Sequence, residues 1–77
     1  MKTVLLNGPE ITHELLAEKF GFPSYYGKNL DALHDCLTDI AEDTALILQN
    51  SAKTDPRLLA VLRDCEEENP KLKIYEG

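Results

Sequence analysis

The chain has 77 residues, the length of one small domain, and its 43% hydrophobic content is enough for a core. Its 14 acidic and 8 basic residues give a net charge of −6, so phosphate backbones would repel it and direct nucleic-acid binding is disfavoured. No stretch approaches the roughly 20 apolar residues of a membrane span, and the N-terminal apolar run is too short for a signal peptide, so we expect a cytoplasmic protein without a membrane anchor.

The N-terminal part of the chain predicts one strand and one helix. An apolar run over residues 3–6 is followed by Asn-Gly-Pro, which is typical of a strand that ends in a turn. Thr12 is a favourable N-cap for a helix over residues 13–20, which Gly21 ends and Pro23 prevents from resuming. The side chains that this helix would bury are Leu15, Leu16 and Phe20.

The middle of the chain predicts a second helix and a second strand. Asn29 is a good N-cap for a helix from Leu30 to about Ala41. At about 100° per residue its apolar residues share one side, the expected core face. These residues are Leu30, Leu33, Leu37 and Ile40. Residues 44–49, TALILQ, are apolar and partly β-branched, so they predict a strand buried on both faces.

The C-terminal part predicts a third helix and a last strand. Asp55 can cap the helix, and Pro56 suits its first position because the missing N–H costs nothing there. The helix would run to about Glu68, before Asn-Pro, and residues 71–76 would alternate as the last strand. The expected core stripe of the helix is Leu58, Val61, Leu62 and Cys65.

The resulting order, β-α-α-β-α-β, predicts a two-layer α/β domain over residues 1–77. Strands separated by helices pair in parallel through right-handed crossovers. If the strand order is 1-2-3, each crossover advances in the same direction. We therefore expect a three-stranded parallel sheet with all three helices packed on one face.

Carboxylates recur at four-residue intervals in the second predicted helix. Asp31, Asp35 and Asp39 fall within one narrow arc together with Glu42, opposite the core face. Residues four apart on a helix are neighbours, so like charges there cost about 0.2–0.5 kcal/mol per pair. The simplest interpretation of such a row is an ordinary solvated face.

Three observations favour a binding surface instead. No lysine or arginine lies between Asn29 and Lys53 to relieve the repulsion. The acids at 39, 42 and 43 would sit at the helix C-terminus, where the helix dipole disfavours negative charge. Tyr25 and Tyr26 precede the helix, and exposed tyrosines beside concentrated charge suit a protein interface. Carboxylates near tyrosines can imitate the phosphates and bases of RNA.

The stretch YYGKNLDALHDCLTD, residues 25–39, resembles the signature of the barstar family, intracellular inhibitors of secreted-type bacterial ribonucleases. Every fixed position of YYG-x-NLDAL-x-DCLT matches, and the resemblance extends over nearly the whole chain. It implies a barstar-like fold and a stoichiometric inhibitor that blocks the active site of a basic ribonuclease. It does not imply an enzyme.

The resemblance also implies roles for single residues. Asp35 matches the central carboxylate that occupies the phosphate site of the ribonuclease, and Tyr25 matches a tyrosine that packs against the catalytic histidine. Further contacts are implied for Gly27, Asn29 and Asp31, with Thr38 at the rim and Asp64 and Glu68 as outlying acids. The remaining residues of the expected partner-binding surface are Tyr26, His34, Asp39 and Glu42.

Four positions differ from the namesake of the family. His34 stands in place of tryptophan, Asp39 in place of glycine, Ile40 in place of an aromatic residue, and Lys28 in place of an acid. Since these departures lie in or beside the predicted surface, the target ribonuclease can differ from that of the family's namesake.

A catalytic site, a metal site and a different interaction module are the alternatives to the inhibitor. His34, Asp31 and Asp35 could be acid/base groups or metal ligands, but they would project from a convex helix without a glycine-rich phosphate loop or an HExxH pattern. Spacing of four also differs from the alternating acids of a calcium loop. We therefore expect no catalytic residue, metal or cofactor, and a free chain that is a monomer. An acidic interaction module with a non-ribonuclease target remains the alternative, because fold does not fix function.

The two cysteines fit no zinc or redox spacing. Cys65 lies on an apolar stripe and Cys36 flanks one, so both are expected to be reduced thiols in or near the core.

Overall fold

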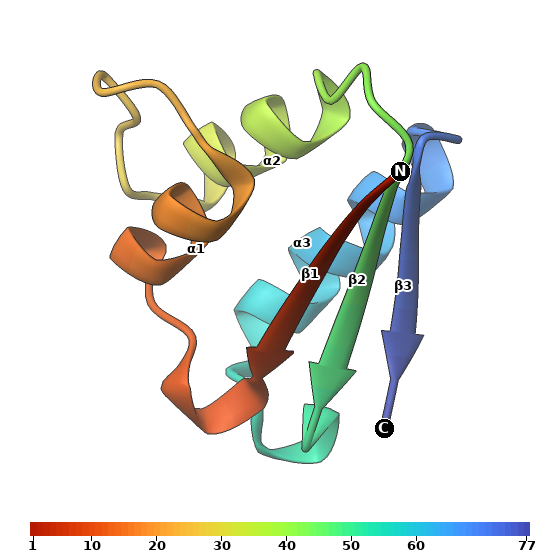
Figure 1. Ribbon diagram of the computed structural model, residues 1–77. Helices are drawn as coiled ribbons and strands as arrows, with labels where there is room; N and C mark the ends of the chain where they lie inside the picture. Colours follow the sequence, from red (N-terminus) through yellow and green to blue (C-terminus); the bar gives the residue numbers. More distant parts are fainter.

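A three-stranded parallel sheet forms one layer of the computed structural model, which describes residues 1–77 (Figure 1). The strands are β1 (Lys2–Asn7), β2 (Thr44–Gln49) and β3 (Leu72–Glu76), in the order β1-β2-β3. Both pairings are parallel, and their register places Leu5, Ile47 and Tyr75 in one row across the sheet. The predicted strand order and direction are confirmed.

Three α-helices form the second layer: α1 (His13–Phe20), α2 (Leu30–Thr38) and α3 (Pro56–Glu68). Two short 3-10 helices, η1 (Gly8–Glu10) and η2 (Ser51–Lys53), follow β1 and β2. Each of the three helices begins where its cap residue predicts. The side chains of Thr12, Asn29 and Asp55 accept hydrogen bonds from backbone N–H groups in the first helical turn, at 3.1, 2.8 and 2.9 Å. None of the helices is both long and apolar enough to cross a membrane.

The core lies between the sheet and the helices. The sheet buries alternate residues on its helix-covered face, and each helix adds leucine or aromatic side chains to the same cluster. The fully buried leucines of this cluster are Leu6, Leu16, Leu33, Leu37, Leu46, Leu48, Leu62 and Leu72. Leu15, Leu30, Ile40 and Val61, which were also predicted for the core, are partly buried and pack against it.

The opposite face of the sheet is open, and this corrects the prediction that β2 is buried on both faces. Ala45 is buried, but Ile47 is 39% exposed, and its neighbours in the row, Leu5 and Tyr75, are each 57% exposed. The physical reason is the topology: crossovers that all advance in one direction place every helix on the same side.

Helix α2 is shorter than predicted, because it ends at Thr38 and not near Ala41. Continuation would require the carbonyl oxygen of Leu37 to accept from the N–H of Ala41. Instead the side-chain amide of Asn69 donates to the carbonyl oxygens of Leu37 and Ile40, at 3.0 and 3.1 Å. Asn69 is 6% exposed, so this buried contact ends the helix and turns the chain toward β2.

Candidate functional site

An acidic ridge, defined here as Asp31, Asp35 and Asp39, lies along the exposed side of α2 and its C-terminal cap. All three residues are exposed. Their carboxylates form no ion pair and no hydrogen bond within the chain, whereas the chain forms five ion pairs elsewhere. Asp31 lies in the first turn, where the helix dipole favours it, and Asp39 is the C-cap, where the dipole disfavours it.

Glu42 was predicted on the same arc, but the early end of α2 removes the basis of that prediction. The residue lies in the connection to β2, and its carbonyl oxygen accepts a hydrogen bond from the hydroxyl of Thr44 at 2.9 Å. Asp43 also lies beyond the helix, 3.8 Å from the ammonium group of Lys71. The unfavourable dipole effect therefore applies to Asp39 alone.

The two tyrosines before α2 differ in burial, which corrects their joint prediction as exposed residues. Tyr25 is 86% exposed, but Tyr26 is only 7% exposed. The Tyr26 ring packs against Phe22, with 4.9 Å between ring centroids, and its hydroxyl lies 2.6 Å from His13 Nδ1. Burial, with smaller effects from Cys36 and Glu14, raises the pKa of Tyr26 to about 12. Tyr26 thus holds the loop to α1, and Tyr25 alone presents a free ring.

The turn from the tyrosines into α2 has an unusual backbone. Lys28 has φ of 54°, in the left-handed region that non-glycine residues seldom adopt. Its ammonium group lies 3.7 Å from Glu14 of α1. Asn29 uses its side-chain oxygen as the cap of α2, while its amide lies 3.4 Å from the carbonyl oxygen of Gly27. Gly27 and Asn29 remain exposed, so both can still contact a partner.

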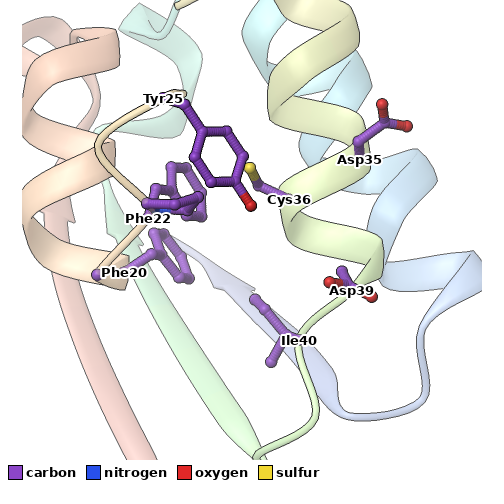
Figure 2. A pocket seen from close by; sticks show the side chains of 9 residues that line it. Phe20, Phe22, Tyr25, Asp35, Cys36, Asp39 and Ile40 are labelled. Atoms are coloured by element: carbon purple, nitrogen blue, oxygen red, sulfur yellow. The ribbon is translucent and has the colours of Figure 1, made fainter. Parts of the chain in front are cut away.

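The connection between α1 and α2, residues 21–29, is called the aromatic loop here. A hollow of about 330 Å³ opens between the aromatic loop and α2. In Figure 2 the Tyr25 ring reaches from the loop toward Cys36, and the Asp35 carboxylate points away from the loop. The lining residues are Phe20, Gly21, Phe22, Pro23, Tyr25, Asp35, Cys36, Asp39 and Ile40. Sequence analysis missed this hollow, although the aromatic composition of the connection was a signal for it.

The cysteines are both free. Cys65 is fully buried, as predicted, and burial raises the pKa of its thiol to about 11. Cys36 is half-buried at the hollow. Burial, together with the carboxylates of Asp35 and Asp39, raises the pKa of the Cys36 thiol.

The remaining predicted residues lie at the junction of α2 and α3. His34 Nε2 lies 2.5 Å from Glu68 Oε2, so this pair links the two helices. Thr38 is half-buried, and its hydroxyl donates to the carbonyl oxygen of His34 at 2.8 Å. Asp64 is exposed on α3 and lines a second hollow with His34, Glu67 and Glu68. No three His, Cys, Asp or Glu residues are grouped to hold a metal ion.

Comparisons with known proteins found a matching family and a curated relative. The family model described as "Barstar (barnase inhibitor)" matches residues 1–75. Among curated proteins, the "Putative ribonuclease inhibitor YrdF" of Bacillus subtilis (strain 168) is 35% identical over an alignment of 81 positions, and the alignment covers 88% of this chain and 89% of that protein.

Proposed function

The chain belongs to the barstar family, and on that basis we propose that it inhibits a basic ribonuclease by binding it stoichiometrically. The description of the family names inhibition of barnase, and the Bacillus subtilis relative is named as a ribonuclease inhibitor. In this proposal the acidic ridge and Tyr25 cover the active site of the enzyme.

The observation that carries the proposal is a row of three carboxylates along one helix, none of which has a basic partner within the chain. Five acids elsewhere lie within 4.0 Å of a basic side chain: Glu14, Asp43, Asp55, Glu68 and Glu76. The three ridge carboxylates have no such partner and repel one another along α2. Such repulsion lowers the stability of the free domain, and a cationic partner would relieve it.

The proposed mechanism is occupation of the site without chemistry. A ribonuclease must place cationic groups around the phosphates of its substrate, and a carboxylate can pair with those groups in place of a phosphate. Asp35 is in the middle of the ridge, so a partner would desolvate it most. The exposed ring of Tyr25 can stack on a flat group of the enzyme.

The test is titration of the purified chain into barnase, and into any protein that the chain captures from its native host, with RNA hydrolysis as the readout. We expect the rate to fall linearly and to reach its minimum at one chain per enzyme. Asp35→Asn should weaken inhibition, and Glu18→Gln should not. Glu18 is an exposed acid of α1 outside the ridge, so this control removes the same charge elsewhere.

Two results would contradict the proposal. One is that neither barnase nor a captured protein loses RNA hydrolysis when the chain is added. The other is equal inhibition by wild type and Asp35→Asn. A captured partner without ribonuclease activity, bound through the ridge, would favour the acidic interaction module instead.

A further inference from the structure

The face of the sheet that the helices leave bare, called the open face here, carries an apolar row that the proposed function does not use. The row consists of Leu5, Ile47 and Tyr75, side by side across the three strands. Three of the five large hydrophobic residues that the chain exposes lie in it, so they form one patch and are not scattered singly. All three helices lie on the other side of the sheet (Figure 1), so the acidic ridge stays accessible when the open face is covered.

A parallel sheet with one bare face is unusual. Parallel strands occur almost only in proteins that cover both faces of the sheet, and such strands are nearly continuous apolar runs. β2 contains a run of this kind from Ala45 to Leu48, although helices cover only one of its faces. The composition of β2 therefore suits a second cover that the free chain does not supply.

The open face differs in charge from the rest of the chain. On either side of the apolar row the register places Thr3, Ala45 and Lys73, and Asn7 and Gln49. None of these residues is acidic, although the chain has 14 acids and a net charge of −6. Two copies of the chain repel each other through most of their surfaces, and the repulsion is smallest when they approach through this face.

The shape of the open face also fits a copy of the same sheet. Three strands about 4.8 Å apart form a face about 14 Å wide, whereas a single helix is only about 10–12 Å wide. A second three-stranded sheet covers the full width, because two sheets pack with their strands within about 30° of each other. We propose that the open face binds a second copy of this chain, which gives a two-fold dimer with the helices on the outside.

Ile47 is at the centre of this proposed interface. It lies in the middle row of the middle strand, so two-fold packing of the open faces places the two Ile47 side chains against each other at the axis. Leu5 and Tyr75 extend the apolar contact to both outer strands. Lys73 lies away from the axis, so the lysines of the two copies do not meet.

The dimer should be weak. A face about 14 Å wide and about 20 Å long is small beside the roughly 800 Å² of surface that each partner contributes to a stable interface. Repulsion between two chains of charge −6 opposes association further at low salt. We therefore expect a monomer at micromolar concentrations and a mixture of monomer and dimer at millimolar concentrations.

The test uses the free chain and no ribonuclease, so its outcome is independent of the proposed function. The ¹⁵N-labelled chain is followed by NMR from micromolar to millimolar concentrations, and its mean mass is measured by sedimentation equilibrium. The mass should rise toward that of two chains, and the amide shifts should change on the open face. Salt should strengthen this dimer, since the screening length falls from about 30 Å at 0.01 M to about 8 Å at 0.15 M. A contact made through the ridge carboxylates would instead weaken.

Variants at the axis give the sharpest comparison. Ile47→Glu should weaken association at least tenfold, because it brings two carboxylates together at the axis. The matched control is Ala60→Glu, which adds the same charge at an exposed position of α3 and should associate as wild type does. Ile47→Lys alone should also stay monomeric. An equimolar mixture of Ile47→Glu and Ile47→Lys should associate more tightly than either variant alone, since opposite charges then meet.

Three results would overturn this inference. They are a mass and a spectrum that stay constant up to millimolar concentrations, shifts on α2 and not on the open face, and association of a folded Ile47→Glu chain equal to that of wild type. If Ile47→Glu does not fold, Tyr75→Ser decides the question, and unchanged association of that variant would also contradict the dimer. A chain that stays monomeric, but loses a bound host protein on Ile47→Glu, would show that a different partner covers the face.

Discussion

His34 Nε2 and Glu68 Oε2 lie 2.5 Å apart and join α2 to the end of α3. Both residues were predicted to contact a partner, and in the free chain they contact each other. Their side chains are 40% and 57% exposed, so the pair remains accessible at the edge of the predicted surface. A partner would therefore meet a preformed pair and not two independent side chains.

The contribution of this pair to stability should be small, because both side chains are largely hydrated. We expect a double-mutant cycle with His34→Gln and Glu68→Gln to give a coupling energy of about 0.2–1 kcal/mol at pH 6. Urea unfolding of the four proteins measures it. A coupling energy of zero would contradict this prediction.

Charge removal at the two ends of α2 should have opposite effects on the stability of the free chain. Asp39→Asn removes a carboxylate that the helix dipole and Asp35 disfavour, so it should stabilise by a few tenths of a kcal/mol. Asp31→Asn relieves the repulsion with Asp35 but removes a charge that the helix dipole favours by about 0.3–1 kcal/mol, so its net effect should be a slight destabilisation.

Denaturation at low salt measures both changes, and the differences should shrink at about 1 M salt, where screening acts within about 3 Å. Glu42→Gln is the matched control. Since Glu42 lies outside the helix, Glu42→Gln should change the unfolding free energy less than Asp39→Asn or Asp31→Asn does. Destabilisation above about 1 kcal/mol by Asp39→Asn would mean that this acid has a structural role.

Asn69 should be more important for stability than any acid of the ridge. Its side chain donates to the carbonyl oxygens of Leu37 and Ile40 and accepts from the N–H of Lys71. Asn69→Ala removes all three bonds and leaves the buried carbonyl oxygen of Leu37 with only the 3.4 Å contact to the N–H of Ile40, so we expect a loss of about 2–3 kcal/mol in unfolding free energy.

The matched control for Asn69 is Asn7→Ala, because Asn7 also accepts a side-chain hydrogen bond, from Asn50, but in an exposed position. The effect of this control should stay within about 0.5 kcal/mol. Equal losses for the two alanine variants in urea unfolding would show that Asn69 does not hold the end of α2.

Tyr26 should make stability depend on pH in the alkaline range. Burial raises its pKa from 10.0 to about 12 in the folded chain. Between these values the unfolded chain releases a proton that the folded chain retains, so the unfolding free energy falls as pH rises. This contribution is fully present below pH 10 and is lost as pH approaches 12.

The measurement is chemical unfolding of wild type and Tyr26→Phe at several pH values in this range, under reducing conditions. At neutral pH the variant should be less stable by about 1 kcal/mol, because it loses the contact with His13. Above pH 10 the wild type should lose stability more steeply. The thiol of Cys65, whose pKa is also raised, is present in both proteins and cancels in the comparison. Parallel slopes would contradict the prediction.

Acids at different places on the surface should affect different steps of binding to the ribonuclease. Asp35→Ala would leave cationic groups of the partner buried and unpaired, at a cost of about 3–5 kcal/mol that appears mainly as faster dissociation. Glu42→Ala and Glu68→Ala should mainly slow association, with an effect that fades as salt is added. Stopped-flow kinetics at two salt concentrations separate these effects. If all three variants lose the same affinity, and the loss depends only on salt, these acids act only by attracting the partner before contact.

The sequence predicted those features of the fold that depend on neighbouring residues. Each helix start is marked by its own cap residue, and the parallel order follows from alternating strands and helices. The end of α2 could not be predicted in this way, since it depends on Asn69, 32 residues after Leu37.

The candidate site, like the fold, was predicted only where it depends on neighbouring residues. Helical spacing was enough to place Asp31 and Asp35 on one exposed side. The burial of Tyr26 depends on His13 of α1, and the hollow depends on how the aromatic loop packs against α2. Those are tertiary contacts that no local pattern contains.

The ridge carboxylates contact solvent and not the rest of the chain, and this separates recognition from folding. Their replacement changes what the surface attracts and leaves the leucine core and the Asn69 contacts in place. Asp39 is also one of the four positions at which the chain differs from the family's namesake. A lineage can therefore exchange these side chains one at a time and acquire surfaces for new partners while every intermediate still folds.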